Sequence, residues 1–201
     1  MQPEKLILAS ASPRRRDLLA ELGLSFEVFV SNVIEDDRPE LEPQYLVMQN
    51  AILKAESVMS KFPNALVLGS DTTVSLEGQI FSKPTTLEEA GVMLGELSGR
   101  VHQVYTAVSL RWQSGSYQED FYEVSEVRFK NLSDTDISAY HALVNPLDKA
   151  GAYGIQEERE RIIESICGSF QTIMGLPTQA LVDRLNQNGF DFKSGSLGNS
   201  L

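Results

Sequence analysis

Two long segments of this chain alternate between apolar and polar residues, and they constrain the fold more than any other feature. The segments GRVHQVYTAVSLRW and YEVSEVRFKN lie on either side of a turn at Gly115. Because successive side chains of a strand point to opposite faces, alternation with a period of two is typical of strands. Two such strands joined through a glycine turn predict an antiparallel pair, so a purely parallel sheet is excluded.

Helices are expected between the other strands. Ser12 followed by Pro13 is a helix start signal after the apolar strand KLILAS, and Gly23 is a typical stop. Further helices are expected over residues 44–62, 86–97, 133–144 and 177–188. Further strands are expected in FEVFV, on both sides of a Gly-Ser-Asp break in NALVLGSDTTVSLEGQIFSKP, and in RIIESICGSFQTIMG as two strands or one bent strand. Interspersed helices and hairpins predict a mixed α/β fold.

The length of the chain predicts one compact domain. At 201 residues it is long enough for a substantial core but shorter than chains whose cores usually divide. We expect this domain to cover residues 1–190 and the polar residues 191–201 to form a mobile tail. No apolar run approaches the roughly 20 residues of a membrane span, and neither a secretory signal nor a transit peptide is visible.

Charge and cysteine content exclude several classes of protein. Seventeen Lys and Arg against 28 Asp and Glu give a net charge of −11, which argues against binding to polymeric DNA or RNA. The single cysteine, Cys167, fits a reducing, cytoplasmic location and is expected to be a buried, inert thiol rather than a nucleophile. Because the chain has only two histidines, any metal should be held by oxygen ligands, as Mg²⁺ and Mn²⁺ are.

Three consecutive arginines at the start of the first predicted helix are the clearest functional feature. A helix start carries unpaired N–H groups and partial positive charge, so cations are unfavourable there unless an anion is bound. Arg14, Arg15 and Arg16 follow Ser12 and Pro13 directly. A polyphosphate would resolve this conflict, since guanidinium groups match phosphate oxygens in geometry. The alternative is that the arginines point into solvent and pair with nearby carboxylates.

Other polar residues are candidates for the same site. Asp71 follows an apolar strand, where α/β proteins commonly place ligand-binding groups, and its alternative is a role in a turn. Lys54 and Lys83 would bind phosphate or would remain surface lysines. Glu35 begins the acidic run Glu35-Asp36-Asp37, which would suit Mg²⁺ bound to phosphates or would simply be solvated.

Familiar catalytic motifs are absent from the sequence. It has no Walker loop, no dinucleotide-binding GxGxxG, no HExxH and no Ser-His-Asp order. The residues alone therefore predict a protein that binds a small phosphorylated ligand.

The motifs resemble those of one known family, the Maf proteins, which are nucleoside triphosphate pyrophosphatases formerly described as septum-formation inhibitors. The matching segments cover most of residues 5–185 in the order of the family: LILASASPRRRDLLAELGLSFEV, NAILKA, VLGSDTTVSLEGQIFSKP, LSGRVHQVYTAV, NPLDKAGAYGIQ and MGLP. The resemblance implies a twisted mixed sheet flanked by helices with a deep cleft, similar in shape to inosine triphosphate pyrophosphatases, and often a homodimer.

The resemblance also implies the reaction. A nucleoside triphosphate would be cut between its α and β phosphates by water with a divalent metal, Mg²⁺ or Mn²⁺, giving the monophosphate and diphosphate. Asp71 would accept the proton from water, and Asp71 and Glu35 would hold the metal. The residues expected around the triphosphate are Ser10, Arg14, Arg15, Lys54 and Lys83.

Three positions resemble the branch of the family that acts on dTTP and UTP, namely Arg14, Thr72 and Gln156. The Gln156 amide could accept from uracil N3–H and donate to O4, and the rotated amide would suit cytosine equally well. Modified uridine triphosphates are further candidate substrates. The chain departs from the family pattern directly after Gln156, because residues 157–167 are charged and contain no glycine.

Two rival functions stay open beside the dTTP/UTP pyrophosphatase. One is a nucleotide-sensing regulator of cell division that binds a triphosphate without hydrolysing it. The other is a pyrophosphatase of the branch that acts on 7-methyl-GTP. Neither a polymeric nucleic acid nor a membrane is an expected partner.

Overall fold

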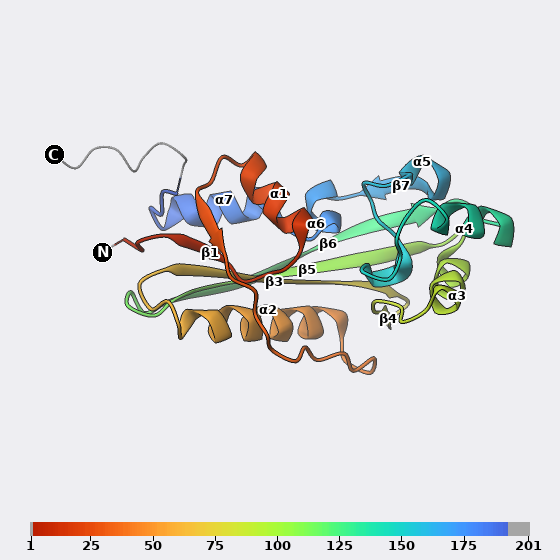
Figure 1. Ribbon diagram of the computed structural model, residues 1–201. Coiled ribbons are helices and arrows are strands. Elements are labelled where there is room, and N and C mark those ends of the chain that lie inside the picture. The colour runs from red at the N-terminus through yellow and green to blue at the C-terminus, as the bar shows by residue number, and fades with distance from the viewer. Residues whose placement is uncertain (1, 193–201) are drawn as a thin grey trace.

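A mixed sheet runs through the centre of the molecule (Figure 1). The computed structural model describes residues 2–192. The strands are β1 (Leu6–Leu8), β2 (Phe26–Val28), β3 (Leu66–Leu76), β4 (Gln79–Phe81), β5 (Val101–Trp112), β6 (Tyr117–Phe129) and β7 (Ile163–Cys167). Within residues 2–192 they form one seven-stranded sheet in the order β2-β1-β3-β5-β6-β7, with β4 paired to β3. Strand β1 is parallel to β2 and β3, whereas the other pairs are antiparallel, so the predicted mixed α/β fold is confirmed.

The predicted antiparallel hairpin is the longest strand pair of the sheet. Strands β5 and β6 pair from Val101 with Arg128 to Trp112 with Tyr117. The alternate residues of β5 that begin with His102 are buried, as period-two alternation predicts: His102, Val104, Thr106, Val108 and Leu110. The hairpin therefore supplies the scaffold against which the shorter strands and the helices pack.

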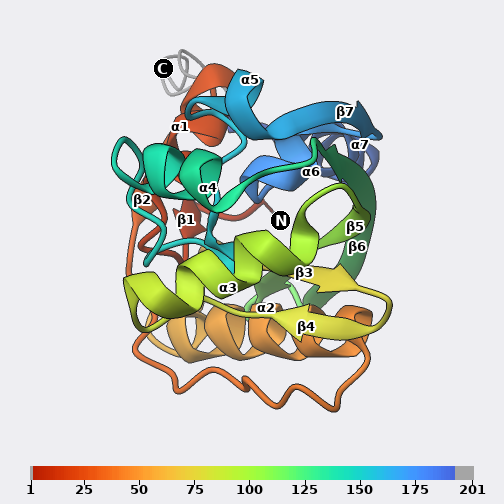
Figure 2. The same ribbon diagram turned by 90° about the vertical axis from the view of Figure 1, so that its right-hand side faces the viewer.

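Helices cover both faces of this sheet. They are α1 (Pro13–Glu21), α2 (Pro43–Met59), α3 (Leu87–Leu97), α4 (Asp134–His141), α5 (Arg159–Ile162), α6 (Phe170–Met174) and α7 (Thr178–Gln187), with the 3₁₀ turn η1 (Ala150–Ala152). Helix α2 runs along one face, while α1, α6 and α7 lie on the other, and α3 and α4 lie beyond the end of the long strands (Figures 1 and 2). The longest predicted helix, over residues 44–62, corresponds to α2.

Helix α2 lies unusually close to β3 because of one glycine. A Cβ atom on Gly69 would lie 2.2 Å from the Ala51 carbonyl oxygen and 2.7 Å from the Ala55 backbone nitrogen. Both atoms belong to the backbone of α2, so a side chain at Gly69 would push the helix away from the strand. This close approach brings the inner face of α2 to the middle of β3.

Two predicted strand boundaries are wrong. The expected Gly-Ser-Asp break does not exist, since β3 continues from Leu66 to Leu76 and pairs with β5 across these residues. The segment 161–175 begins with the last two residues of α5 and continues as one short strand, β7, and then helix α6. Gly168 has a φ of +108°, and the Ser169 side chain caps the helix by accepting a hydrogen bond from the Thr172 backbone N–H. These local helix-start signals overrode the apolar alternation of the segment.

The prediction of a buried cysteine is also wrong. Cys167 is exposed at the end of β7, which is an edge strand of the sheet. It pairs with Glu126 of β6, and the Glu126 side chain is exposed on the same face. Alternation identified the strand, but it did not reveal that the side chain at this position is exposed.

Within residues 2–192, no helix combines the length and the apolar character that crossing a bilayer requires. Residues 193–201 of the predicted tail lie outside the described residues.

Candidate active site

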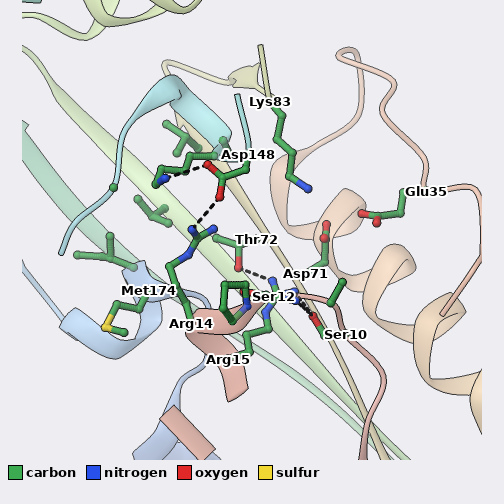
Figure 3. Close-up of a pocket in the computed structure, with 18 of the residues that line it drawn as sticks. Ser10, Ser12, Arg14, Arg15, Glu35, Asp71, Thr72, Lys83, Asp148 and Met174 are labelled. Carbon is green, nitrogen blue, oxygen red and sulfur yellow. Dashed lines mark hydrogen bonds and ion pairs between the residues drawn. The ribbon is translucent and has the colours of Figure 1, made fainter. Parts of the chain in front are cut away.

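A cavity of about 330 Å³ lies among the start of α1, the middle of β3, the segment before α2, the η1 loop and α6 (Figure 3). Eight of the nine predicted site residues line it: Ser10, Arg14, Arg15, Glu35, Lys54, Asp71, Thr72 and Lys83. These residues come from segments far apart in the sequence. Gln156 is exposed and is not among the lining residues, although its neighbour Ile155 is.

Helix α1 begins at this cavity without a cap of its own. Ser12 is the N-cap residue but makes no side-chain cap hydrogen bond, Pro13 follows it, and the first turn contains no acidic residue. Ser12, Pro13 and Arg14 all line the cavity. The unpaired N–H groups and positive end of α1 are therefore available to an anion.

The three arginines of the first turn have different surroundings. Arg14 and Arg15 line the cavity, whereas Arg16 is exposed and pairs with the adjacent Asp17, with its Nε 3.5 Å from Asp17 Oδ1. The structure therefore places Arg14 and Arg15 at the cavity, whereas Arg16 has the alternative arrangement, in which the side chain faces solvent and pairs with a nearby carboxylate.

Arg15 is buried and is held by the protein on three sides. Its Nε donates to the Gly175 carbonyl oxygen at 2.8 Å, Nη1 to Ser10 Oγ at 3.2 Å, and Nη2 to Thr72 Oγ1 at 2.9 Å. Burial lowers the pKa of Arg15, and the negative charge of Asp71 opposes that shift. Arg15 thus joins α1, β3 and the turn after α6 around the cavity.

Arg14 faces an ion pair in the loop before η1. Its Nη1 lies 3.5 Å from Asp148 Oδ2, while Asp148 Oδ1 accepts a hydrogen bond from Lys149 Nζ at 2.8 Å (Figure 3). Partial burial would raise the pKa of Asp148, but the hydrogen bond and charge of Lys149 and the charge of Arg14 hold it below its ordinary value. This carboxylate orients the Arg14 guanidinium at the cavity.

Asp71 and Glu35 are joined through one lysine. Asp71 lies in β3 and is 8% exposed. Lys54 Nζ donates to Asp71 Oδ1 and to Glu35 Oε2, both at 2.7 Å. Partial burial would raise the pKa of Glu35, but Lys54, with a contribution from Lys83, lowers it below the ordinary value. The Glu35 carboxylate and the Lys83 side chain point toward Asp71 in Figure 3, so the two carboxylates and the two lysines form one charged cluster.

Asn50 belongs to the surroundings of this cluster, and sequence reasoning missed its role. It lies one turn before Lys54 on α2, and its Nδ2 donates to Asp71 Oδ2 at 3.2 Å. Asn50 begins the segment NAILKA, which resembles a motif of the family, but no role was predicted for it. The available signal is its spacing of four from Lys54, which puts both side chains on one face of the helix.

Apolar side chains form another wall of the cavity. They come from β3, β5, α6 and the residue that follows η1: Val74, Val104, Tyr153, Ile173 and Met174. The Tyr153 side chain is fixed by a hydrogen bond, because its hydroxyl lies 2.8 Å from His102 Nε2. A cavity with cations and carboxylates on one side and apolar groups on another suits a ligand with a charged part and a flat, weakly polar part.

The carboxylates of the site suit a metal ion whose remaining ligands include phosphate oxygens. Within residues 2–192, no group of three or more His, Cys, Asp or Glu side chains is placed to hold a metal. The Asp71 and Glu35 carboxylates nevertheless converge, since both lie 2.7 Å from the same Lys54 nitrogen. Mg²⁺ is commonly bound through one or two carboxylates together with substrate phosphates and water, so this pair is a suitable partial site.

Comparison with known proteins identifies relatives that match most of the chain. Residues 5–188 match the family model described as Maf-like protein. The chain is 42% identical to a dTTP/UTP pyrophosphatase of Akkermansia muciniphila over 92% of this chain and 97% of that protein. It is also 42% identical to a dTTP/UTP pyrophosphatase of Symbiobacterium thermophilum, over 97% of this chain and all of that protein. A Bacillus anthracis protein of the same name matches at 42% over 93% of this chain.

A solved structure supports the fold alone. The Staphylococcus aureus Ham1 protein superimposes with a TM-score of 0.50, covering 90% of this chain and 100% of that one, at 18% sequence identity. At this identity the likeness concerns the arrangement of helices and strands, which is that of a mixed sheet flanked by helices.

Proposed function

The chain belongs to the Maf family, and we propose that it hydrolyses dTTP and UTP to the nucleoside monophosphate and diphosphate. The proposal extends to modified uridine triphosphates, provided that the cavity admits the altered base. The observation that carries it is the position of the Asp71 carboxylate in a cavity that also contains Arg14, Lys54 and Lys83. The names of relatives at 42% identity support the choice of nucleotides.

In this mechanism Asp71 acts as the proton acceptor. The oxygen of an attacking water forms a bond to the α-phosphorus, the bond between that phosphorus and the α–β bridging oxygen breaks, the diphosphate leaves with this oxygen, and a proton of the water goes to Asp71. Hydrogen bonds from Lys54 to Oδ1 and from Asn50 to Oδ2 fix the carboxylate. Because each carboxylate oxygen has about two lone-pair sites, these bonds leave acceptor capacity for the water.

Positive groups stabilise the charge that develops on the departing diphosphate. Lys83, Arg14 and the N–H groups at the start of α1 are available at the cavity. Arg15 has three of its donor positions occupied by protein oxygens, so its larger contribution is to shape this surface. Preorganised charges act at the moment of reaction without having to reorient, which is usually the largest contribution to catalysis.

Asp71 and Glu35 would hold a divalent metal, Mg²⁺ or Mn²⁺, together with the triphosphate. Such an ion would supply Lewis-acid neutralisation of the phosphate charge. Both carboxylates already share Lys54, whose ammonium would keep them close together before the metal and nucleotide bind.

The nucleoside would lie against the apolar wall that includes Val104, Tyr153 and Met174. Gln156 stays a prediction for recognition of the base edge, since in this structure it is exposed outside the cavity and would have to turn inward. A homodimer and a cytoplasmic location are also parts of this proposal; the lone, unpaired Cys167 supports the second.

A nucleotide panel tests the proposal. The protein is incubated with Mg²⁺ or Mn²⁺ and each of dTTP, UTP, CTP and 7-methyl-GTP, and the products are separated. UMP or dTMP should appear with equimolar diphosphate. Faster cleavage of 7-methyl-GTP would assign the protein to the other branch, and saturable UTP binding without any product would favour the sensing regulator.

The variant Asp71→Asn tests the mechanism. Asparagine keeps the size of the side chain but cannot accept the proton at neutral pH, so kcat for UTP should fall about 10²- to 10⁴-fold. Affinity for the non-hydrolysable analogue α,β-methylene-UTP should change far less, as equilibrium titration would measure. Unchanged turnover would contradict the assignment of Asp71.

A further inference from the structure

We propose that Asn50 is a positioning residue of this site, which ties the segment carrying Glu35 to helix α2 and fixes the rotation of the Asp71 carboxylate. The inference rests on the proposed function for its catalytic consequence. Asn50 does not line the cavity, so it acts through its neighbours and not through contact with a nucleotide.

The first observation is that Asn50 binds both backbone groups of one residue in the acidic segment. Its Oδ1 accepts from the Asp36 backbone N–H at 2.8 Å, and its Nδ2 donates to the Asp36 carbonyl oxygen at 2.9 Å. Asp36 follows Glu35 directly, so the amide holds the residue next to the metal-binding candidate. The segment before α2 contains no regular helix or strand, and a side-chain clamp of this kind replaces a backbone ladder there.

The second observation is that the same amide also reaches Asp71. The Asn50 Nδ2 group donates to Asp71 Oδ2 at 3.2 Å, while Lys54 Nζ donates to Asp71 Oδ1 at 2.7 Å. One turn of α2 thus supplies a donor to each oxygen of the carboxylate. Because rotation of the carboxylate about its Cβ–Cγ bond would move both oxygens away from these two donors, the plane of the carboxylate is fixed.

The orientation of the amide is determined by its partners. An amide offers two N–H donors and one carbonyl acceptor. Both donors face oxygen atoms, those of the Asp36 carbonyl and the Asp71 carboxylate, and the acceptor faces the Asp36 N–H. A flipped amide would place its oxygen against two other oxygens. At 2% exposure Asn50 has little access to water that could replace these partners, so each lost bond is costly.

Lys54 alone cannot perform this task. Its single nitrogen attracts both carboxylates, but a point charge on a flexible chain sets a distance and not the plane of a carboxylate. Asn50 adds direction at Asp71 and a backbone anchor beside Glu35. Together the two residues hold both acidic groups in one arrangement before the metal and nucleotide arrive.

The variant Asn50→Ala tests this inference with two independent measurements, and Gln49→Ala is the matched control. Gln49 is the neighbouring residue of α2, is partly buried and does not line the cavity. Hydrogen–deuterium exchange of the backbone amides in residues 31–42 should become at least severalfold faster in Asn50→Ala and stay unchanged in Gln49→Ala. Unchanged exchange in Asn50→Ala would overturn the clamp.

Kinetics provide the second measurement. In Asn50→Ala, kcat for UTP should fall about 10- to 100-fold, as is typical when a group that orients site ligands is lost. KM should change less than about threefold, because Asn50 does not contact the cavity. An unchanged kcat, or a fall that merely follows the folded fraction measured by circular dichroism, would overturn the positioning role.

The variant Asn50→Asp is a second test of the inference, which applies even if Asn50→Ala does not fold. Aspartate has the same shape and can still accept from the Asp36 N–H, but it presents an oxygen to Asp71 where Asn50 presents a donor. The exchange rate in residues 31–42 should therefore rise less in Asn50→Asp than in Asn50→Ala, whereas kcat should fall at least as far. Faster exchange together with a smaller loss of kcat in Asn50→Asp would contradict the inference. If the unaltered protein turned over neither UTP nor dTTP, the proposed function would fail, and the exchange experiment would still decide whether Asn50 holds the segment.

Discussion

Arg15 and Arg16 are adjacent and chemically identical, yet the fold uses them differently. Arg15 is 8% exposed and donates to three protein oxygens, whereas the side chain of Arg16 is 58% exposed and pairs with Asp17. Successive helix positions differ by about 100° in direction, so only one of the two can face the sheet. The buried guanidinium links segments 160 residues apart in the sequence, from Arg15 to Gly175.

We predict that Arg15→Lys lowers the free energy of unfolding by about 2 kcal/mol or more. An ammonium group cannot make all three hydrogen bonds of the guanidinium, so buried acceptors lose their partners. The measurement is urea unfolding at neutral pH. The matched variant Arg16→Lys, at an exposed position, should stay within about 0.5 kcal/mol of the parent. Equal effects at the two positions would contradict the structural role assigned to Arg15.

Helix α2 is the element that organises the charged cluster. It carries Asn50 and Lys54 on one face, and both side chains reach Asp71 of β3. Their reach depends on the close contact at Gly69, two residues before Asp71, where the backbone of the helix nearly touches the strand. A longer separation between helix and strand would withdraw both side chains from the carboxylate.

We predict that Gly69→Ala both destabilises the protein and impairs turnover. The new Cβ would lie 2.2 Å from the Ala51 carbonyl oxygen, so the helix must shift, at a cost of about 1–3 kcal/mol. Thermal unfolding and UTP hydrolysis would be measured together.

The variant Gly91→Ala is the control for Gly69→Ala. Gly91 lies within α3, and a Cβ there meets nothing within 4 Å. Because alanine favours a helix over glycine, this variant should gain about 0.5–1 kcal/mol with unchanged turnover. If Gly69→Ala behaved in the same way as Gly91→Ala, the contact between α2 and β3 would not position the cluster.

At the scale of the whole molecule, an aromatic cluster joins the hairpin to the loop behind the cavity. His102 of β5 is fully buried between Phe129 of β6 and Tyr153, with ring centroids 4.8 Å and 5.4 Å away. Desolvation by burial lowers the pKa of His102 to about 4. The imidazole is therefore neutral in the folded protein at pH values where it would be partly protonated in the unfolded chain.

We predict that this histidine makes folding stability depend on pH. Its pKa falls from 6.5 in the unfolded chain to about 4 in the fold, so the unfolded state binds the extra proton between these values. Stability should be fully present above about pH 6.5 and should decline as the pH falls toward 4, by about 3 kcal/mol from this group.

The variant His102→Gln isolates that contribution. Its slope of unfolding free energy against pH between 4 and 6.5 should be shallower than that of the parent, even if its stability at pH 7 is lower. Denaturant unfolding at several pH values provides the slopes, and carboxylates contribute equally to both proteins. Parallel curves would show that His102 does not titrate as described.

Much of the architecture followed from local patterns in the sequence. Alternation around Gly115 predicted the hairpin, and Ser12-Pro13 predicted the start of α1, because both signals depend on residues that are neighbours in the chain. The same locality explains the errors: alternation across residues 161–175 hid the helix start at Ser169, and it placed Cys167 in a strand without revealing that its face is uncovered.

The chain by itself determined which chemical groups were available: a cationic helix start, two lysines and a carboxylate at a buried strand. Only the tertiary structure decided which of them meet. It turned Arg15 into an anchor, left Gln156 outside the cavity and brought Asn50 to both Asp36 and Asp71. The physical reason is that side-chain chemistry is set residue by residue, whereas convergence depends on packing between distant segments, such as the contact at Gly69 that no local pattern records.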